Sequence, residues 1–295
     1  MAYVIHLLNI VCIYMILSLS LNIIIGVSGQ FSIAQGAFMG IGAYTSALLA
    51  LKAGIPFWAS ILLSVLVSVL IGFVVGLPSL RLRGDFLGIA TFGFGIIAYS
   101  IFNNLTSITG GPMGMPGIPQ PEILGFSFDS PTKYLILTLS FLLITILILR
   151  AAIYSPFGRI LKAIREDEKA TQVRGIDIAR YKIIAFLVGS GFAGIAGSLY
   201  AHYITFIDPS SFTIMESITI LTMVVIGGMG NIRGPIVGAA VLISIPEILR
   251  FLNIPGAISA PLRQLIYGIL LILIVTLRPK GLWGDYYFGG QKSHS

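Results

Sequence analysis

The segment SPFGRILKAIREDEKATQVRGIDIARYK, residues 155–182, is a charged stretch between two long apolar runs, residues 133–152 and 183–204. Over the full 295 residues, 56% are apolar and only 10% are charged, whereas soluble proteins carry roughly a quarter charged residues. Apolar runs of about 20 residues match the length that a helix needs to cross a bilayer. The sequence therefore predicts an integral membrane protein in which this segment is one of the few parts exposed to water.

Apolar runs recur along the whole chain and lack the alternating pattern of membrane-barrel strands. Because lipid offers no partners to backbone polar groups, helices are the expected spanning elements. The sequence predicts an all-α, polytopic membrane protein with about eight to ten transmembrane helices, and we expect residues 1–295 to form a single transmembrane domain. The expected spans are residues 4–26, 30–51, 57–77, 85–103, 133–152, 183–204, 213–229, 235–252 and 260–277.

Basic residues set the expected orientation, because short cytoplasmic loops accumulate Lys and Arg. Eight of the 18 basic residues fall between Arg150 and Lys182, which places the loop 153–182 in the cytoplasm. The expected crossings then put the N-terminus outside and the C-terminus in the cytoplasm. If the polar span 30–51 is re-entrant, only the N-terminus and the first span change sides. The inner side also receives Arg81, Arg83, Arg233, Arg278, Lys280 and Lys292, and the outer side keeps Lys52, Lys133, Arg250 and Arg263.

Topology also accounts for the net charge of +7, so no nucleic-acid partner is expected. Residues 104–132 form a long outer-face loop in which four prolines and the pair Gly110-Gly111 exclude a regular helix. Loops of this length are commonly functional or disordered. We expect an ordered loop that is either a docking surface or a plain connector.

Two Gly-rich stretches admit two interpretations. They are GQFSIAQGAFMGIGAY, residues 29–44, and GGMGNIRGPIVGA, residues 227–239. Small residues at helical spacing let membrane helices approach closely. Interrupted apolar segments in the two halves of a transporter instead often mark a substrate pathway. Close packing and broken helices that line a pathway both remain open.

The sequence lacks the groups that membrane enzymes and proton-coupled carriers place at mid-membrane. All 11 carboxylates fall in loops or toward span ends, and the three His and one Cys are scattered. A GxxxxGK[ST] loop, which would cradle the phosphates of ATP, does not occur. We therefore expect a non-catalytic chain without cofactor or metal, which is either a passive pathway or is driven by another subunit.

The charged segment has the local signals of a helix. Ser155 can cap a helix that has Pro156 at its first position, and Gly175 suits its end. Asp177 can then cap the following membrane helix. The sequence predicts one short amphipathic helix against the inner membrane face. It is either a topological anchor or a docking element for a cytosolic partner.

Several stretches of this sequence resemble the permease subunits of bacterial ABC importers for branched-chain amino acids, of the LivM type. The resemblance implies an ABC importer permease bundle in the bacterial inner membrane, surrounded by lipid. It also implies a heterodimer with a second, homologous permease, two cytosolic ATPase subunits, and a periplasmic or lipid-anchored substrate-binding protein. The similar stretches are LSLNIIIGVSGQFSIAQGAFMGIGAYTSALL (19–49), LRLRGDFLGIATFGFG (80–95), TSITGGPMGMPGIP (106–119), residues 155–201 and residues 208–250.

In that family the segment matching Ile164 to Gly175 is the coupling helix that enters a groove of the ATPase. This sequence departs from the family's Glu-Ala-Ala-x-x-x-Gly form, because it reads Glu168-Lys169-Ala170 and has Gly175 five residues after Ala170. The implied coupling residues are Ile164, Arg165, Glu166, Asp167, Glu168, Lys169, Ala170 and Gly175. The binding protein would dock near residues 106–119 and 208–216.

Polar residues near the inner ends of the first two spans are the expected pathway lining, namely Asn22, Gln30, Ser32 and Gln35. Related permeases carry urea, short amides or sugars, so the substrate of this chain stays open between branched-chain amino acids and another small polar solute. A stand-alone channel or ion-coupled carrier is the competing class. Backbone carbonyls at broken helices can bind sodium without a carboxylate.

Overall fold

The computed structural model describes residues 2–79, 85–123, 126–251, 256–278 and 280–284. The basic residues Arg81, Arg83 and Lys292, which the orientation prediction uses, lie outside these ranges. Each expected apolar span contains a helix. These are α1 (Ala2–Asn22), α2 (Gln35–Ala53), α3 (Phe57–Ser79), α4 (Asp85–Asn104), α6 (Pro131–Tyr154), α9 (Ile178–Ile204), α10 (Ile214–Gly227), α11 (Arg233–Phe251) and α12 (Gly256–Leu277).

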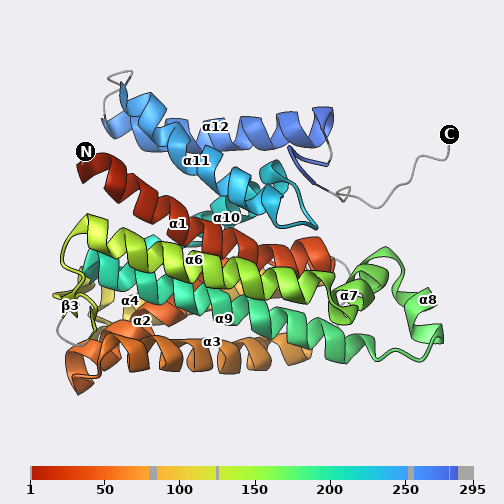
Figure 1. Cartoon of the computed structure of the whole chain (residues 1–295), viewed down its shortest axis with the longest axis horizontal. Helices are drawn as coiled ribbons and strands as arrows, with labels where there is room; N and C mark the ends of the chain where they lie inside the picture. Colours follow the sequence, from red (N-terminus) through yellow and green to blue (C-terminus); the bar gives the residue numbers. More distant parts are fainter. Residues whose placement is uncertain (1, 80–84, 124–125, 252–255, 279, 285–295) are drawn as a thin grey trace.

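The shorter elements lie at the two ends of this helical bundle (Figure 1). We call the end that carries α7 (Pro156–Glu166) and α8 (Glu168–Val173) the inner end, and the opposite end, where α1 begins, the outer end. A five-residue π-helical turn, η1 (Ile23–Val27), extends α1 at the inner end. The outer-end elements are α5 (Thr106–Thr109), η2 (Gly111–Met113), β1 (Met115–Pro116), β2 (Glu122–Ile123), β3 (Phe126–Ser127), β4 (Phe206–Ile207) and η3 (Pro209–Phe212).

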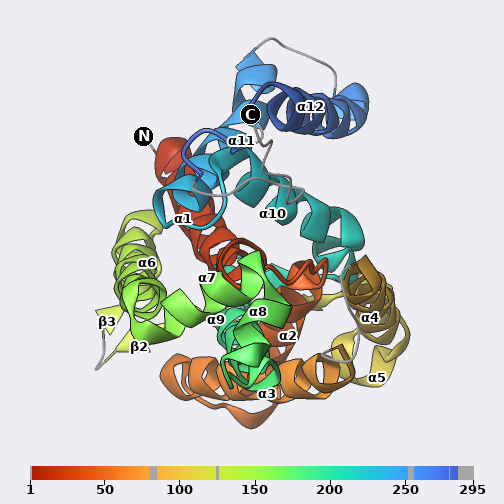
Figure 2. The ribbon, with the colours of Figure 1, turned by 90° about the vertical axis from the view of Figure 1, so that its right-hand side faces the viewer.

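The helices are arranged around α1, most of whose residues are buried. Viewed toward the inner end, α6, α9 and α2 lie on one side of α1, and α10, α11 and α12 form a layer on the other (Figure 2). Six helices of the described part, α1, α2, α3, α4, α6 and α9, are long and apolar enough to cross a membrane. Exposed apolar side chains such as Leu62, Val74 and Ile89 cover the outside of α3 and α4. The chain is thus an all-α, multi-pass membrane protein.

Two expected spans differ from the structure. Residues 30–34 are not helical, because the π turn ends α1 and the chain has no regular structure until Gln35. The span 213–229 is also too long, since α10 has only 14 residues, or about 21 Å of a hydrocarbon core about 30 Å thick. Gly228, with φ of 109°, ends α10 in a conformation that other residues adopt only with strain.

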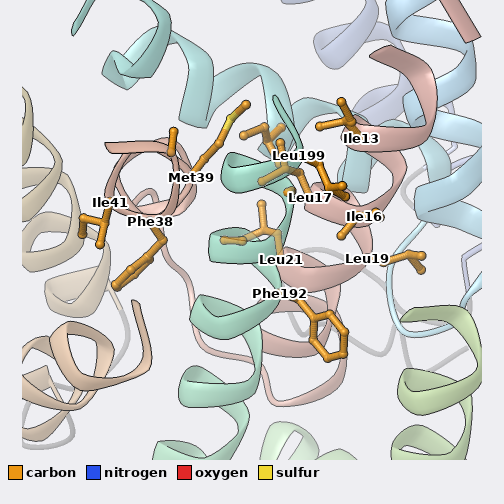
Figure 3. Packing of buried hydrophobic residues seen from close by; sticks show 14 of the residues in the cluster. Ile13, Ile16, Leu17, Leu19, Leu21, Phe38, Met39, Ile41, Phe192 and Leu199 are labelled. Atoms are coloured by element: carbon orange, nitrogen blue, oxygen red, sulfur yellow. The ribbon is translucent and has the colours of Figure 1, made fainter. Parts of the chain in front are cut away.

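The core of the bundle is the contact of α9 with α1 and α2. Figure 3 shows α9 between Ile16 and Leu17 of α1 on one side and Met39 of α2 on the other, and these side chains are almost fully buried. A Cβ atom on Gly197 of α9 would lie 1.9 Å from the Met39 carbonyl oxygen. The backbones of α2 and α9 are therefore in direct contact, as the close-packing interpretation of the glycines predicts.

Both Gly-rich stretches also contain a break in the helix. Residues 28–34 separate η1 from α2, and residues 228–232 separate α10 from α11. Close packing and helix breaks thus occur together in these stretches. A helix break that lines a pathway stays a prediction.

The outer-end loop is held against the end of α9. Strand β1 pairs antiparallel with β4, and the Ile118 N–H donates to the Thr205 carbonyl oxygen over 3.2 Å. His202 connects its Nδ1 to the Pro119 carbonyl oxygen over 2.6 Å and its Nε2 to Ser46 Oγ over 2.8 Å. Because a carbonyl only accepts, Nδ1 carries the hydrogen and Nε2 accepts from Ser46. The described residues of this loop therefore form a fixed surface with residues 205–212.

Candidate coupling site at the inner end

The charged segment forms two helices, α7 and α8, rather than the single helix predicted from the sequence. The caps at its ends are those expected, because Ser155 accepts from the Gly158 N–H and Asp177 accepts from the Arg180 N–H. The single-helix prediction is wrong at Asp167, which adopts an extended conformation and accepts a 3.0 Å hydrogen bond from the Ala170 N–H. Its carboxylate starts a new helix, which is the ordinary role of Asp at a helix N-terminus.

The two helices present different faces to the bundle and to water. Leu161 and Ile164 of α7 are buried, whereas residues 166–170 and 172–175 are all exposed. Val173 is 88% exposed, although it is apolar. Viewed from the inner end, α7 and α8 lie in front of α2 and α9 (Figure 2). Val173 is thus a single exposed apolar side chain on an otherwise polar and charged surface.

Arg165 does not belong to the exposed face, although it stands among the expected coupling residues. Its guanidinium donates to the carbonyl oxygen of Gly26 in η1. A Cβ atom on Gly29 would lie 2.7 Å from Arg165 Cγ, so only glycine lets this side chain cross there. The last carbonyls of a helix lack intrahelical partners and attract cations. Arg165 therefore attaches α7 to the inner end of α1.

Asn22 continues this connection on the other side of η1. Its Oδ1 accepts from the Gly230 N–H over 3.0 Å, and its Nδ2 donates to the Asn231 carbonyl oxygen over 2.7 Å. Both partners lie in the break between α10 and α11, where backbone groups have no helical partners. Asn22 thus replaces the missing helical bonds and ties α1 to this break.

Replacing Asn22 with alanine is expected to destabilise the folded chain by about 3 kcal/mol, because it leaves two backbone groups without partners inside the bundle. Thermal unfolding of the detergent-solubilised chain measures this loss. Asn104→Ala is the matched control, since Asn104 makes one hydrogen bond at an exposed position. A variant at Asn22 that unfolds at the same temperature as the Asn104 variant would contradict the assigned role.

The other polar residues of this region are also buried within the chain. Gln30 donates from Nε2 to Ser28 Oγ over 2.7 Å and to the Lys182 carbonyl oxygen over 3.1 Å. Lys182 in turn forms an ion pair with Glu168 of α8. Ser32 accepts from the Ala34 N–H over 3.4 Å, and Gln35 donates to Ser20 Oγ. Gln30 thus holds the segment between η1 and α2 against α9, and Gln35 holds the start of α2 against α1.

The structure therefore divides the coupling residues predicted from the sequence. Glu166, Asp167, Glu168, Lys169, Ala170 and Gly175 lie on the exposed surface, and Ile164 and Arg165 contact the bundle. Sequence reasoning missed Val173, Gly26 and Gly230. Val173 could have been noticed as an isolated apolar residue in a polar run, whereas no local signal marks a glycine as the partner of a distant side chain.

Comparison with known proteins places this arrangement in a family. The model of a family described as branched-chain amino acid transport system / permease component matches residues 3–275. The chain is 36% identical to the high-affinity branched-chain amino acid transport system permease protein LivM of Salmonella typhimurium, over 92% of this chain and 67% of that protein. It is 30% identical to the probable LivM permease of Methanocaldococcus jannaschii, over 91% of this chain and 90% of that protein.

The second permease type of these systems is a more distant relative. The LivH permease protein of Salmonella typhimurium is 26% identical over 92% of this chain and 91% of its own length. No solved structure is a significant match. The resemblance drawn from the sequence is confirmed over nearly the whole chain, and the chain belongs to the family of permease components of branched-chain amino acid transport systems.

Proposed function

We propose that this chain is the transmembrane permease subunit of an ATP-driven importer for the branched-chain amino acids Leu, Ile and Val. It forms the translocation pathway with a second homologous permease in the bacterial inner membrane. Two cytosolic ATPase subunits drive it, and a periplasmic or lipid-anchored binding protein delivers the substrate. The N-terminus then lies outside, and the C-terminus is cytoplasmic.

The observation that carries this proposal is the two-faced hairpin of α7 and α8. Its exposed residues carry charges of both signs beside Val173, while Arg165 and the Glu168–Lys182 ion pair attach the hairpin to α1 and α9. A loop that only anchored topology would need neither a second helix with its own cap nor attachments to α1 and α9. The hairpin is suited to receive a movement of an ATPase and to pass it to the bundle.

The outer end supports docking of the binding protein. Met113 is 84% exposed and Phe206 is 41% exposed, and the pairing of β1 with β4 holds their two segments side by side. Exposed apolar side chains on a fixed surface favour association with another protein.

The proposed pathway residues Asn22, Gln30, Ser32 and Gln35 are at most 4% exposed in this chain. Gln35 supports a lining role best, because its Oε1 accepts no hydrogen bond from the described residues. All four are buried and make hydrogen bonds within the chain, so a lining role for any of them requires that the helices separate during transport.

Val173→Asp is expected to lower the affinity of the chain for its ATPase subunits by at least tenfold, since it places a charge at the centre of the proposed contact. Co-purification and ATP-driven uptake in proteoliposomes measure the effect. Met113→Asp is the matched control: it makes the same chemical change at the outer end, so it should weaken binding-protein docking and leave ATPase assembly intact.

Normal ATPase assembly and uptake by the Val173 variant would contradict docking through α8. Uptake by this chain alone, without ATP or partners, would instead establish a channel or an ion-coupled carrier. The substrate is tested in the same proteoliposomes by competition between leucine, isoleucine, valine, urea and short amides.

A further inference from the structure

A second feature of the inner end is a cavity with several basic residues in its lining. We propose that the cavity between α6, the start of α11 and the segment after α12 is a binding site for the headgroup of an anionic phospholipid of the inner leaflet. Its volume is about 950 Å³. Its lining residues include Arg150, Arg233, Arg278, Lys280, Tyr154 and Trp283.

Four of these residues are basic, and none of the described lining residues is acidic. Within the described part of the chain, no carboxylate forms an ion pair with Arg150, Arg233 or Arg278. Their charges repel one another, and an anion between them would remove that repulsion. A guanidinium presents planar N–H donors that match the oxygens of a phosphate. The basic residues of the cavity therefore select a phosphate-bearing anion.

The three arginines come from different elements and meet at one level of the bundle. Arg150 lies four residues before the end of α6, Arg233 is the first residue of α11, and Arg278 follows the last residue of α12. In the expected topology this level is the cytoplasmic surface of the membrane. Basic pockets between membrane helices on this side are suited to bind anionic lipid headgroups.

Hydrogen bonds hold the part of the cavity lining that Leu282 and Trp283 contribute. The Leu282 N–H donates to the Ile226 carbonyl oxygen and the Trp283 N–H to the Gly227 carbonyl oxygen, both over 2.9 Å. Asn231 donates from its side chain to the Trp283 carbonyl oxygen. The segment after α12 is therefore docked on the break between α10 and α11, and it holds its part of the lining in place.

The apolar part of the lining favours a lipid over a soluble phosphate. Ile146, Ile232 and Leu282 contribute apolar wall, and the neighbouring α6 exposes Leu143 and Leu147 by 58% and 56%. An acyl chain can follow this surface, whereas a free phosphate gains nothing from it. Tyr154 and Trp283 are 61% and 58% exposed, and such amphipathic aromatic residues concentrate at the membrane–water interface.

The chain has two tryptophans, Trp58 and Trp283, so Trp58→Phe leaves one reporter in the cavity. We suggest reconstituting this full-length variant into phosphatidylcholine bilayers that contain increasing fractions of phosphatidylglycerol. In one series the phosphatidylglycerol carries brominated acyl chains, which quench tryptophan; in the other the phosphatidylcholine carries them. We expect brominated phosphatidylglycerol to quench Trp283 at much lower membrane fractions than brominated phosphatidylcholine does.

Substitution of Arg150, Arg233 and Arg278 by glutamine should reduce this preference by about fivefold per residue, or about a hundredfold together. Lysine at the same three positions keeps the charge, so this variant should retain most of the preference. It therefore shows whether a loss in the glutamine variant comes from the missing charge or from misfolding. Arg180→Gln is the matched control, because Arg180 is an exposed inner-end arginine outside the cavity. It should leave the preference unchanged.

Equal quenching by the two brominated lipids would overturn the proposal, and so would a preference that survives the triple glutamine change. Inorganic phosphate at constant ionic strength separates the two sources of the anion. Loss of the preference at millimolar phosphate would assign the cavity to a soluble phosphate compound. Recovery of Trp283 fluorescence on adding the ATPase subunits would assign the cavity to a protein partner. Either result would overturn the lipid proposal.

Discussion

Arg165→Gln is expected to lower ATP-driven uptake about 10- to 100-fold while the chain still assembles with its ATPase subunits. The glutamine side chain is shorter and uncharged, so the hydrogen bond from α7 to the Gly26 carbonyl oxygen is lost. A coupling free energy of about 1–3 kcal/mol between two sites corresponds to a change of this size. The exposed docking face, residues 166–170 and 172–175, keeps its composition.

Transport should be lost while assembly is kept, because Arg165 contacts the bundle and not the exposed docking face. Arg165 binds η1, and Asn22 at the other side of η1 binds the break between α10 and α11. A movement of α7 can thus reach the end of α10 through η1, which is a short π-helical turn. Turns of this kind occur frequently at functional sites within helices. Removal of Arg165 interrupts this route at its first step.

The measurement is uptake per ATP hydrolysed in proteoliposomes, together with co-purification of the ATPase. Arg159→Gln is the matched control, because Arg159 is an exposed arginine on the same helix. Arg165→Lys should recover part of the coupling, since one ammonium donor can still approach the carbonyl. Normal uptake by the glutamine variant would show that α7 transmits its movement by another contact, and lost assembly would place Arg165 in the docking surface.

The sequence predicted those features of this site that depend on neighbouring residues. Ser155 and Asp177 cap the helices that follow them, and Gly175 adopts a positive φ of 79° after α8. Each of these follows from local backbone chemistry. The break at Asp167 was missed although its signal is also local, because Asp in a charged run fits both a helix surface and a cap.

Contacts between distant residues were beyond sequence reasoning. Arg165 and Gly26 are 139 positions apart, and Asn22 and Gly230 are 208 positions apart. The polarity of Asn22 predicted a role in the pathway, which stays a prediction, whereas its hydrogen bonds to the break between α10 and α11 could not be predicted. The length of α10 was overestimated for a similar reason: the apolar run continues through Met229, but the helix ends where Gly228 and Gly230 turn the chain toward the segment after α12.

Gly197→Ala is expected to destabilise the folded chain by about 3 kcal/mol or more. The added methyl group would lie 1.9 Å from the Met39 carbonyl oxygen and 2.9 Å from the Ala43 N. Both are backbone atoms, so no side-chain rotation relieves the clash and α2 must move away from α9. Overpacking of this kind typically costs about 1–3 kcal/mol, and more where the backbone cannot yield.

Gly93→Ala on α4 is the matched control, because it makes the same substitution within a helix where no atom lies within 4 Å of the added Cβ. Alanine favours the helix over glycine by about 1 kcal/mol, so this variant should be at least as stable as the unmodified chain. The Gly197 and Gly93 variants are compared by their apparent Tm in detergent and by their yield of monodisperse protein. Gly42→Ala tests the same contact from α2, where the new Cβ would lie 2.3 Å from the Gly194 carbonyl oxygen. If the Gly197 and Gly42 variants were as stable as the Gly93 variant, the backbones of α2 and α9 would have to lie farther apart, and these glycines would not hold the bundle together.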